Sequence, residues 1–594
     1  MNIKYQKRIF LFFGVLFFFF DNKSLVGAFL DGKTFFFPRS DHSKVMATRE
    51  NAYHSLFFKG KAGEQEYFSK KGRPFADVVF SCNHSFGSDD IASYFFGQDK
   101  LIFSGSRSAS RQSTHILSDY FGTTSDFQST VSFSPVVRSA SVCFSTGIGL
   151  EALCKKLYAK ITLPFVYKSF DMRLKENVTS QGINSHPAGY MSGGNQPLSK
   201  TVLVHNIKTA FKGEQSFGDM RTPLQYGKID GVQKKFSCAD ITIEVFRKII
   251  NKRKKQLDVY IKGVIPTASS ADARYLFEPI VGSNDHWQLG LGMSGSYFCL
   301  ENEEKERKVQ LCADFELLHL FSSKQKRSFD LKNNGFGSRY MLMQEFNSFS
   351  DGVFSVPGSV PYQYSGSLLP VINKTTLDCR VKVAVQADLL LNCIYFYKER
   401  WKINGGYNLW MRSSEKIYNR KLFKNDVYGL KGDTQMYGFF TNTVDVAVPL
   451  NATQSEATLC KAQGSGNLRQ TLLANDFANA NVDNPALVSE LATPGTLNHL
   501  TGDDITTLGV AGPLQTRGSN NPILLQDSDI DEQSAEAPFC SSHTFFVAAD
   551  YCWPENRFKP LLGGGLKIEC AGTHDSKKGV FSRFGLWVNA GITI

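Results

Sequence analysis

The sequence lacks a second long apolar run. Beyond Phe20, no segment approaches the roughly 18 consecutive apolar residues that mark a candidate transmembrane helix. This absence argues against an α-helical membrane protein. If the mature chain lies in a membrane, it must cross as a closed β-barrel, because in lipid only helices and closed barrels satisfy every backbone hydrogen-bonding group.

The sequence also lacks the motifs that carry familiar enzyme chemistry. It contains no P-loop, no H-E-x-x-H helix, no nucleophile elbow and no Gly-rich dinucleotide loop after a strand. No CxxC and no Cys/His spacing suited to a metal occurs, so we expect no enzyme activity, no cofactor and no bound metal. His286 and His319 are interpreted as interfacial or loop residues. A Ser/His or Asp/His group of a hydrolase at a barrel rim stays open as an alternative.

The chain has 12 cysteines, an even number that would suit a disulfide framework in an exported protein. Several are expected instead to act as small apolar residues on strand faces: Cys143, Cys379, Cys393 and Cys570. Cys460 and Cys540 lie in or beside a long polar insertion and are the best candidates for a disulfide. The sequence leaves open whether they pair.

The N-terminus has the pattern of a secretory signal peptide. Lys4, Lys7 and Arg8 precede the apolar run 9–20, and small residues follow at 26–28. An apolar run of about 12 residues is too short for a membrane anchor helix, the alternative interpretation. We therefore predict a signal peptide over residues 1–28, export, and a mature chain that begins near Phe29.

What the sequence does contain is period-two alternation over long stretches. Between residues 377 and 391 every odd position is apolar, while the even positions are mostly polar. After a charged turn near Glu399, apolar residues or glycine occupy every odd position from Trp401 to Met411. This pattern predicts a β-hairpin with one apolar and one polar face.

The same alternation predicts strands over 257–265, 287–294 and 309–317. A half-buried sheet of a soluble sandwich shows the same pattern with its apolar face inward. Soluble strands average about five or six residues, whereas barrel strands need ~9–11 to cross a bilayer. Runs of about 12 to 15 residues favour a transmembrane barrel with an even number of strands, roughly 12–16. Aromatic residues near strand ends fit interfacial girdles: Trp287, Trp401, Tyr407, Tyr551 and Trp553.

The chain ends on an alternating strand. Its apolar residues form a predicted C-terminal assembly strand: Phe584, Leu586, Val588, Ala590, Ile592 and Ile594. A polar turn at 571–579 joins it to an alternating strand over 562–569. The strand resembles the C-terminal signal that bacterial outer-membrane β-barrel proteins present to their assembly machinery. That signal usually ends on an aromatic residue, and this chain ends on isoleucine.

One long segment, 433–540, breaks the alternation. Its net charge is −10, which leaves +22 for the rest of the chain. A segment this long without periodicity is either functional or disordered. We predict a long acidic loop within the barrel, extracellular or folded inward. The segment 29–127 is predicted to be a lead-in, a plug or the first strands, and the barrel itself is predicted over 128–594.

The middle of the chain carries a family resemblance. The run 265–290, which includes Glu278-Pro279 and Trp287-Gln288, resembles a segment of uncharacterised outer-membrane barrel proteins from intracellular bacteria of the Dependentiae type. The segments 326–330 and 120–122 resemble them too. This resemblance covers most of the chain from about residue 75 and implies envelope localisation with no assigned activity. More broadly, the chain is similar to porin-like barrels.

These features together predict an all-β protein: a transmembrane antiparallel β-barrel of a Gram-negative outer membrane. Its expected partners are outer-membrane lipid and the outer-membrane assembly machinery. If the apolar faces meet lipid, the polar faces line the lumen. The predicted lumen-lining residues are Asp378, Arg380, Lys382, Gln386, Asp388, Lys402, Asn404, Arg412, Lys567 and Glu569. The alternative is that these residues pair with each other and brace the wall.

The predicted function is porin-like passive diffusion of small hydrophilic solutes, with a bias toward anions from the basic surplus. One alternative is an envelope-surface protein that uses the barrel as an anchor and the 433–540 loop for contacts. A secreted soluble β protein is the third. Because the polar residues are spread along strands, we expect no nucleic-acid partner. A homo-oligomer and the solute selectivity are left open.

Overall fold

The computed structural model describes residues 32–37, 39, 75–87, 91–106, 108–150, 154, 156–186, 191, 203–252, 254–302, 304, 306–348, 362–398, 400–431, 439–441, 444–448, 453, 455–461, 523–553, 555–556, 558–572 and 580–593. The predicted signal peptide lies outside the described residues.

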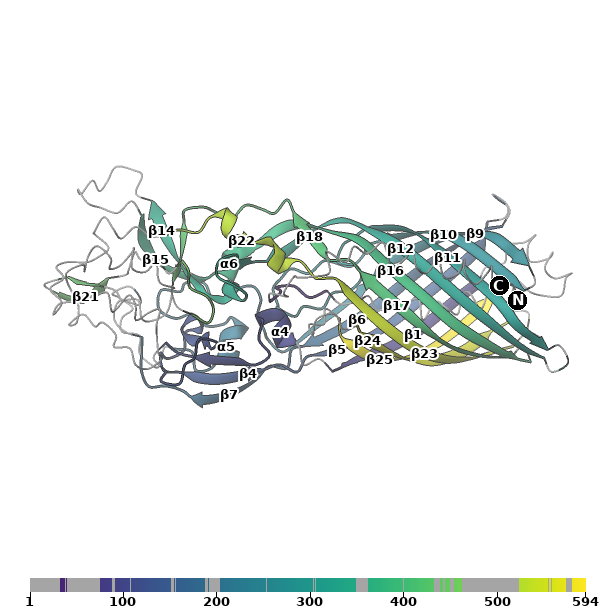
Figure 1. Ribbon diagram of the computed structural model, residues 1–594, viewed down its shortest axis with the longest axis horizontal. Coiled ribbons are helices and arrows are strands. Elements are labelled where there is room, and N and C mark those ends of the chain that lie inside the picture. Colours follow the sequence, from purple (N-terminus) through teal and green to yellow (C-terminus); the bar gives the residue numbers. More distant parts are fainter. Residues whose placement is uncertain are drawn as a thin grey trace, which may run out of the picture.

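A closed antiparallel barrel of 12 strands forms one half of the described molecule (Figure 1). Each strand pairs with its neighbours in chain order, so the barrel is up-and-down. Its strands are β1 (Phe75–Phe86), β5 (Val136–Gly149), β6 (Leu157–Asp171), β9 (Ile241–Lys252), β10 (Lys255–Ile265), β11 (Gln288–Asn302), β12 (Arg307–Ser328), β16 (Thr376–Tyr397), β17 (Trp401–Arg412), β23 (Cys540–Cys552), β24 (Leu561–Ala571) and β25 (Ser582–Thr593).

The last strand closes the barrel against the first. β25 pairs with β1 from Phe75 opposite Thr593 to Phe86 opposite Ser582. Because both strands are also paired on their other sides, with β24 and β5, neither presents a free edge. The pairing of β25 with β1 therefore closes the barrel.

The two ends of the barrel differ in the length of their connections. At one end, which also holds β25's C-terminal end, the strands are joined by short turns such as 253–254 and 398–400. At the other end, long connections join β1 to β5, β6 to β9, β12 to β16 and β17 to β23. We call the first end the short-turn rim. The long connections fold together into a second body, which we call the head.

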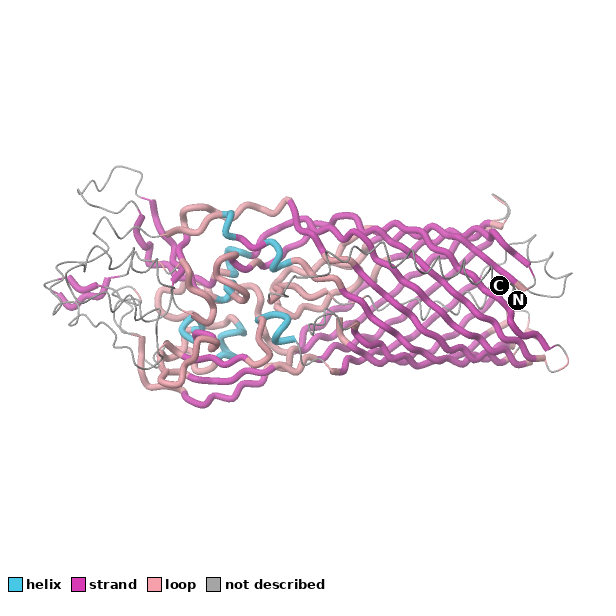
Figure 2. The backbone as a smooth tube through the Cα atoms, in the orientation of Figure 1, coloured by secondary structure: helices cyan, strands magenta, loops and turns pink. Residues whose placement is uncertain are grey.

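The head contains small sheets and short helices. Figure 2 shows that the helices of the described chain lie in this half of the molecule. One sheet consists of β2 (Leu101–Ser104), β3 (Ile116–Leu117), β4 (Gln128–Ser132) and β7 (Lys175–Ser180), and a second of β14 (Leu342–Ser348), β15 (Tyr362–Pro370) and β19 (Tyr428–Lys431). Two further sheets have two strands each: β13 (Asp330–Leu331) with β22 (Ile530–Asp531), and β20 (Phe439–Thr441) with β21 (Val444–Val448). The helices of the head are α4 (Ile91–Phe96), α5 (Ile207–Lys212), α6 (Ile372–Thr375) and the 3-10 turns η1 (Ser118–Phe121), η4 (Ser338–Tyr340), η7 (Asp527–Asp529) and η8 (Glu532–Ala535). Two strands, β8 (Val232–Cys238) and β18 (Glu415–Tyr418), extend the barrel sheet toward it.

Aromatic side chains from separate connections form the core of the head. The ring centroid of Phe211 in α5 lies 5.2 Å from that of Phe121, which belongs to the β1–β5 connection. It lies 5.3 Å from that of Tyr340, which belongs to the β12–β16 connection. Phe96 stacks on Tyr340 at 5.7 Å. These rings are buried, so the long connections form one packed body instead of independent loops.

The described N-terminal residues run inside the molecule, where the head meets the barrel. The backbone N–H of Lys33 donates to the carbonyl of Tyr94 at 2.6 Å, and that of Thr34 donates to the carbonyl of Ser534 at 2.9 Å. Phe36 packs 5.0 Å from Phe581, just before β25. We call residues 32–37 with Arg39 the inner segment.

The predicted fold class is confirmed, because the described chain is an all-β closed antiparallel barrel. The predicted hairpin over 377–411 is β16 and β17, and the strand over 257–265 is β10. The first barrel strand is β1, upstream of the predicted start at 128. The segment 29–127 thus supplies the inner segment, one barrel strand and part of the head.

The described parts of the predicted acidic loop belong to the folded head. Ala457, Leu459 and Leu525 are buried in its core, and η7, β22 and η8 follow. The remainder of 433–540 lies largely outside the described residues.

Candidate functional site

Polar side chains fill the inward face of the barrel strands. On β17, four polar side chains are buried: Lys402, Asn404, Asn408 and Arg412. The alternating residues Trp401 and Ile403 point outward and are about half exposed. The alternation of the sequence produces this division directly, because successive side chains of a strand leave opposite faces.

An ion-pair chain crosses the inside of four strands. Lys160 of β6 pairs with Glu244 of β9 at 2.9 Å. Lys262 of β10 lies 3.6 Å from Glu244 and 3.3 Å from Glu316 of β12. Tyr260 donates from its hydroxyl to Asp314 at 2.9 Å. Lys160, Glu244, Lys262 and Glu316 thus each have an opposite charge within 4 Å, which is the condition for burying a charge at tolerable cost.

Arg39 of the inner segment binds polar side chains of other barrel strands from inside the barrel. Its guanidinium donates to Glu569 of β24 at 3.0 Å and to Asn408 of β17 at 2.8 Å, and it lies 3.5 Å from Asp388 of β16. It also sits over the ring of Trp410 at 5.3 Å. A single side chain thus bridges three neighbouring regions of the wall from inside, using the fork geometry that lets arginine bind several oxygens at once.

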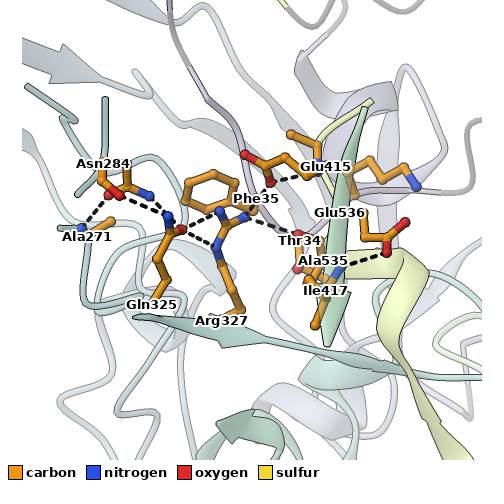
Figure 3. Close-up of polar contacts among 12 residues, drawn as sticks. Thr34, Phe35, Ala271, Asn284, Gln325, Arg327, Glu415, Ile417, Ala535 and Glu536 are labelled. Atoms are coloured by element: carbon orange, nitrogen blue, oxygen red, sulfur yellow. Dashed lines mark hydrogen bonds and ion pairs between the residues drawn. The ribbon is translucent and has the colours of Figure 1, made fainter. Parts of the chain in front are cut away.

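A second arginine cluster lies where the barrel passes into the head (Figure 3). Arg327 of β12 pairs with Glu415 of β18 at 3.1 Å and donates to the carbonyl of Ala535 at 3.0 Å. Phe35 lies against the same guanidinium, with its ring centroid 3.1 Å from the central carbon. Phe37 stands similarly over Arg412 at 3.9 Å. The inner segment is therefore held by aromatic rings as well as by Arg39.

A cavity of about 100 Å³ lies between the ion-pair chain and the inner segment. The charged residues of its lining are Arg39, Lys160, Asp240, Glu244, Lys262, Asp314, Glu316 and Asp388. Acidic residues outnumber basic ones in this lining. The total charge of the chain outside 433–540 is +22, so the acidic lining differs in sign from the chain around it. The space has room for a few water molecules.

The predicted lumen-lining residues fall into two groups. Asp388, Lys402, Asn404, Arg412, Lys567 and Glu569 are buried on the inward face, and Gln386 is partly buried beside the cavity. Asp378 and Lys382 are exposed and Arg380 is half-buried, on the face opposite Cys379 and Val381, whose side chains belong to the head core. For these three the expected orientation is wrong, because the alternation of β16 changes face between Val383 and Ala387.

The predicted C-terminal assembly strand is β25. Phe584, Leu586, Val588 and Ile592 point outward and are exposed, and Ala590 is half-buried. Ile594 lies outside the described residues. The role of β25 in assembly stays a prediction.

The histidines singled out in the sequence make structural contacts. His286 is buried, shares a 2.7 Å hydrogen bond with the carbonyl of Phe321 and lies 3.3 Å from the hydroxyl of the buried Ser323. Burial lowers the pKa of His286. His319 is exposed on the outer face and bonds to the carbonyl of Ala384. Both side chains of the Ser323–His286 pair are buried.

Two further features of the described residues concern metals and cysteines. No group of three or more His, Cys, Asp or Glu side chains suited to a metal occurs in the described part of the chain. Cys460 and Cys540 are free, the first beside Gln98 in the head and the second packed with Trp410 at the barrel rim. The disulfide left open by the sequence is therefore not formed. No helix within the described ranges is long and apolar enough to span a membrane.

Sequence reasoning missed Arg39, Arg327 and Glu415. Arg39 lies in a segment without alternation, and Arg327 follows the predicted strand end at residue 317. Simple alternation would have placed Arg327 outside, because even positions of β12 are buried up to Leu320 and odd positions from Ser323 to Arg327. A register shift between Leu320 and Ser323 causes this change of face.

Comparison with known proteins yields distant structural likeness alone. No protein-family model matches the chain, and no curated protein sequence matches it. The fold is similar to an outer membrane channel from Pseudomonas putida F1, at 8% identity and TM-score 0.30, covering 88% of this chain and 96% of that one. It is similar to the translocator domain of the autotransporter NalP from Neisseria meningitidis, at 6% identity and TM-score 0.25, covering 93% and 95%. A Pseudomonas aeruginosa FadL homologue matches at 6% identity and TM-score 0.24, covering 88% and 90%. Likeness this low says nothing about what this chain does, and the resemblance to Dependentiae-type proteins stays a prediction.

Proposed function

We propose that this chain is an outer-membrane β-barrel that admits small hydrophilic solutes through a lumen closed, in this conformation, by its own inner segment. The single observation that carries the proposal is the division of the barrel strands into an apolar outer face and a charged inner face. The proposal includes export by the predicted signal peptide and gives the chain no catalytic role.

The outer face supports membrane insertion. Every barrel strand exposes large apolar side chains, among them Phe80, Ile161, Ile261, Leu291, Leu311, Leu391, Ile403, Phe545, Leu566 and Val588. A soluble monomer rarely exposes a contiguous apolar patch above a few hundred Å², and this belt surrounds the whole barrel. Its natural solvent is the hydrocarbon of a bilayer.

The inner face supports a polar passage that is not permanently open. Side chains that line a wide aqueous pore are exposed to water, whereas Lys402, Asn404 and Glu569 are at most 3% exposed. The inner segment occupies the interior near the head and is held by Arg39 and two phenylalanine rings. Simple porin-like diffusion therefore requires that the inner segment move. The excess of acidic residues around the cavity also favours cations over the anions expected from the net charge.

Conductance in planar bilayers tests the proposal. The wild-type protein should conduct little, and Arg39→Ala should raise conductance several-fold, because the inner segment loses its polar contacts with the wall. The wall itself keeps partners for both carboxylates: Arg583 lies 2.6 Å from Glu569, and Asn408 donates to Asp388. Lys398→Ala at the short-turn rim is the control and should behave as wild type. Heat-modifiable migration on gels verifies that each variant folds. If both the wild type and Arg39→Ala are silent, the channel proposal fails.

A second candidate function is supported by the head. It has its own aromatic core and is built from most of the long connections, so the barrel is also suited to anchor a contact domain on the cell surface. A barrel that stays sealed when Arg39 is removed, together with cell-surface exposure of the head, would favour this candidate.

A secreted soluble protein is the third interpretation. Detergent dependence separates it from the other two: a membrane barrel should precipitate when detergent is removed, because the apolar belt is then exposed to water. Purified mature protein that stays monomeric and folded in plain buffer would contradict membrane insertion.

A further inference from the structure

The densest cationic segment of the chain lies at the tip of the β9–β10 hairpin. Six Lys and Arg residues occur between positions 247 and 255, and no acidic residue lies between Glu244 and Asp258. The side chains of Arg247, Lys252, Lys254 and Lys255 are exposed. This hairpin tip alone carries half of the net charge of +12.

The hairpin tip projects from the short-turn rim. The pairing of β9 with β6 ends with Arg247 opposite Leu157, so residues 248–252 of β9 extend past the end of β6. On the other side, β10 keeps its pairing with β11 as far as Lys255 opposite Tyr297. The cations therefore stand beyond the end of β6, beside β11, which continues to Asn302.

A β-bulge places two apolar side chains among these cations. The register between β9 and β10 shifts at Leu257 and Asp258, which leaves Ile249 without an opposite residue. As a result, Ile249 and Ile250 are both exposed, at 49% and 37%, although consecutive residues of a regular strand point to opposite faces.

An aromatic ring connects one of these cations to the apolar belt. Lys255 stands over the ring of Tyr297 at 5.6 Å. Lys248, by contrast, stands over Tyr158, whose ring is buried inside the barrel. Tyr297 is exposed on the same strand, β11, as the outward-facing Leu291 and Met293. Apolar wall, aromatic ring and ammonium group thus follow each other toward the rim, as hydrocarbon, interface and headgroup do in a bilayer leaflet.

We propose that the hairpin tip, residues 247–252 with Lys254 and Lys255, binds the headgroups of anionic phospholipids in the leaflet at the short-turn rim. The inference rests on the proposed membrane insertion and deepens it by naming a lipid partner. Clustered Lys and Arg beside a membrane attract anionic lipid, and each cation near the surface contributes to that attraction.

A lipid surface accounts for the hairpin tip better than an acidic protein does. An acidic partner would satisfy the cations but gives no reason for the exposed Ile249 and Ile250. A bilayer receives both, because the isoleucines continue the apolar belt while the lysines reach the phosphates.

Spin-labelled lipids test this inference on the full-length protein in phosphatidylcholine vesicles. The wild-type protein should bind labelled phosphatidylglycerol at least roughly threefold better than labelled phosphatidylcholine at low salt, and high salt should remove most of the preference. The triple variant Lys252→Gln, Lys254→Gln and Lys255→Gln should bring the ratio close to one. The matched control, with exposed head lysines changed as Lys175→Gln, Lys208→Gln and Lys421→Gln, should retain the preference.

The outcomes separate this inference from the proposed function. Protein that does not enter vesicles contradicts membrane insertion itself. Protein that inserts without preferring phosphatidylglycerol, or a triple variant that keeps the wild-type preference, overturns the lipid site and leaves the barrel proposal intact. If the triple variant does not fold, the salt dependence of the wild type decides.

Discussion

At the scale of single residues, Glu415 holds two buried arginines. Its carboxylate lies 3.1 Å from Arg327 and 3.5 Å from Arg412, and it accepts a hydrogen bond from the backbone of Ala537 at 3.1 Å. All three side chains are at most 1% exposed. Removing one partner from a buried ion pair leaves an uncompensated charge, and here it would leave two.

Glu415→Gln should therefore lower the free energy of unfolding by about 3–5 kcal/mol. The temperature at which the folded gel band converts to the unfolded band measures the effect in detergent. Glu536→Gln is the control, since glutamine keeps an oxygen for the backbone N–H of Ile417 and loses only a pair with the exposed Lys416. If both variants lower the conversion temperature equally, the buried position of Glu415 between two arginines adds nothing to stability.

Glu278, in the β10–β11 connection, makes stability depend on pH. Burial raises its pKa to about 7, with the nearby charge of Asp272 adding to the rise and Lys235 opposing it. A carboxyl with a raised pKa binds more protons in the folded than in the unfolded state. Its stabilising contribution is complete below about pH 4.5 and is lost as pH rises through 7.

Glu278→Gln should remove this loss of stability at rising pH, because glutamine does not ionise. Between pH 5 and 8 the variant should gain stability relative to wild type, by less than about 1.4 kcal/mol per pH unit. Thermal conversion of the gel band across that range provides the measurement, with the exposed Glu214→Gln as control. A constant difference between wild type and variant at all pH values would contradict the assignment.

Much of the residue-level pattern could be predicted, and part of it could not. Alternation alone assigned Lys402, Arg412 and Lys567 to a polar strand face, and these side chains are buried together inside the barrel. Arg39 could not be predicted, because its partners Glu569 and Asn408 are brought to it by closure of the barrel and no local pattern encodes that.

At the scale of elements, β16 shows how one extra residue redirects a strand. Its pairing with β12 moves from Leu318 opposite Gln386 to Leu320 opposite Val383. β16 therefore has one residue more than β12 between these two pairs, which is a β-bulge. Side chains at odd positions point into the head core before this bulge and outward to the barrel surface after it. A shift of one residue inverts every later side chain, and nothing in the sequence between Val383 and Ala387 announces it.

Inward glycines make room for aromatic rings of neighbouring strands. Gly292 of β11 pairs with Tyr260 of β10, and a Cβ added at Gly292 would stand 2.0 Å from the tyrosine ring. That ring cannot move freely, because it packs 4.6 Å from Phe246 and its hydroxyl bonds to Asp314. Gly263, on β10 itself, has open space around its Cβ position.

Gly292→Ala should therefore destabilise the barrel by about 1–3 kcal/mol, as overpacking of a filled interior does. Gly263→Ala, the matched control on the adjacent strand, should be neutral or slightly stabilising. Urea unfolding of the protein in lipid vesicles compares the two. A larger cost at Gly263 than at Gly292 would contradict this account of the packing.

At the scale of the whole molecule, the barrel could be predicted and the head could not. Barrel strands pair with their neighbours in the chain, so each hairpin leaves a local signature in the sequence. The head is assembled from long-range contacts, such as Phe96 with Tyr340, between short elements that lack a period. Its residues therefore resemble loops when they are considered one segment at a time.

The unequal ends of the barrel also define an orientation. Barrels of the outer membrane have short turns on the periplasmic side and longer connections outside the cell. If the chain is such a barrel, as we propose, we expect the head to face the exterior and the cationic hairpin tip to face the periplasm. The short-turn rim also holds the C-terminal end of β25, since Thr593 pairs with Phe75 and Phe75 with Gly147 near the end of β5.

Epitope tags inserted at the two ends test this orientation in a Gram-negative host. A tag after the exposed Asn425, between β18 and β19 in the head, should bind antibody on intact cells. A tag after Lys398, in the β16–β17 turn, should bind only after the outer membrane is permeabilised. Both tagged proteins must show heat-modifiable migration, which confirms a folded barrel. The reverse pattern of staining would place the head in the periplasm, where it could not contact another cell, and the lipid site at the outer leaflet. The orientation therefore decides whether the contact role proposed for the head is physically available and which leaflet the hairpin tip would meet.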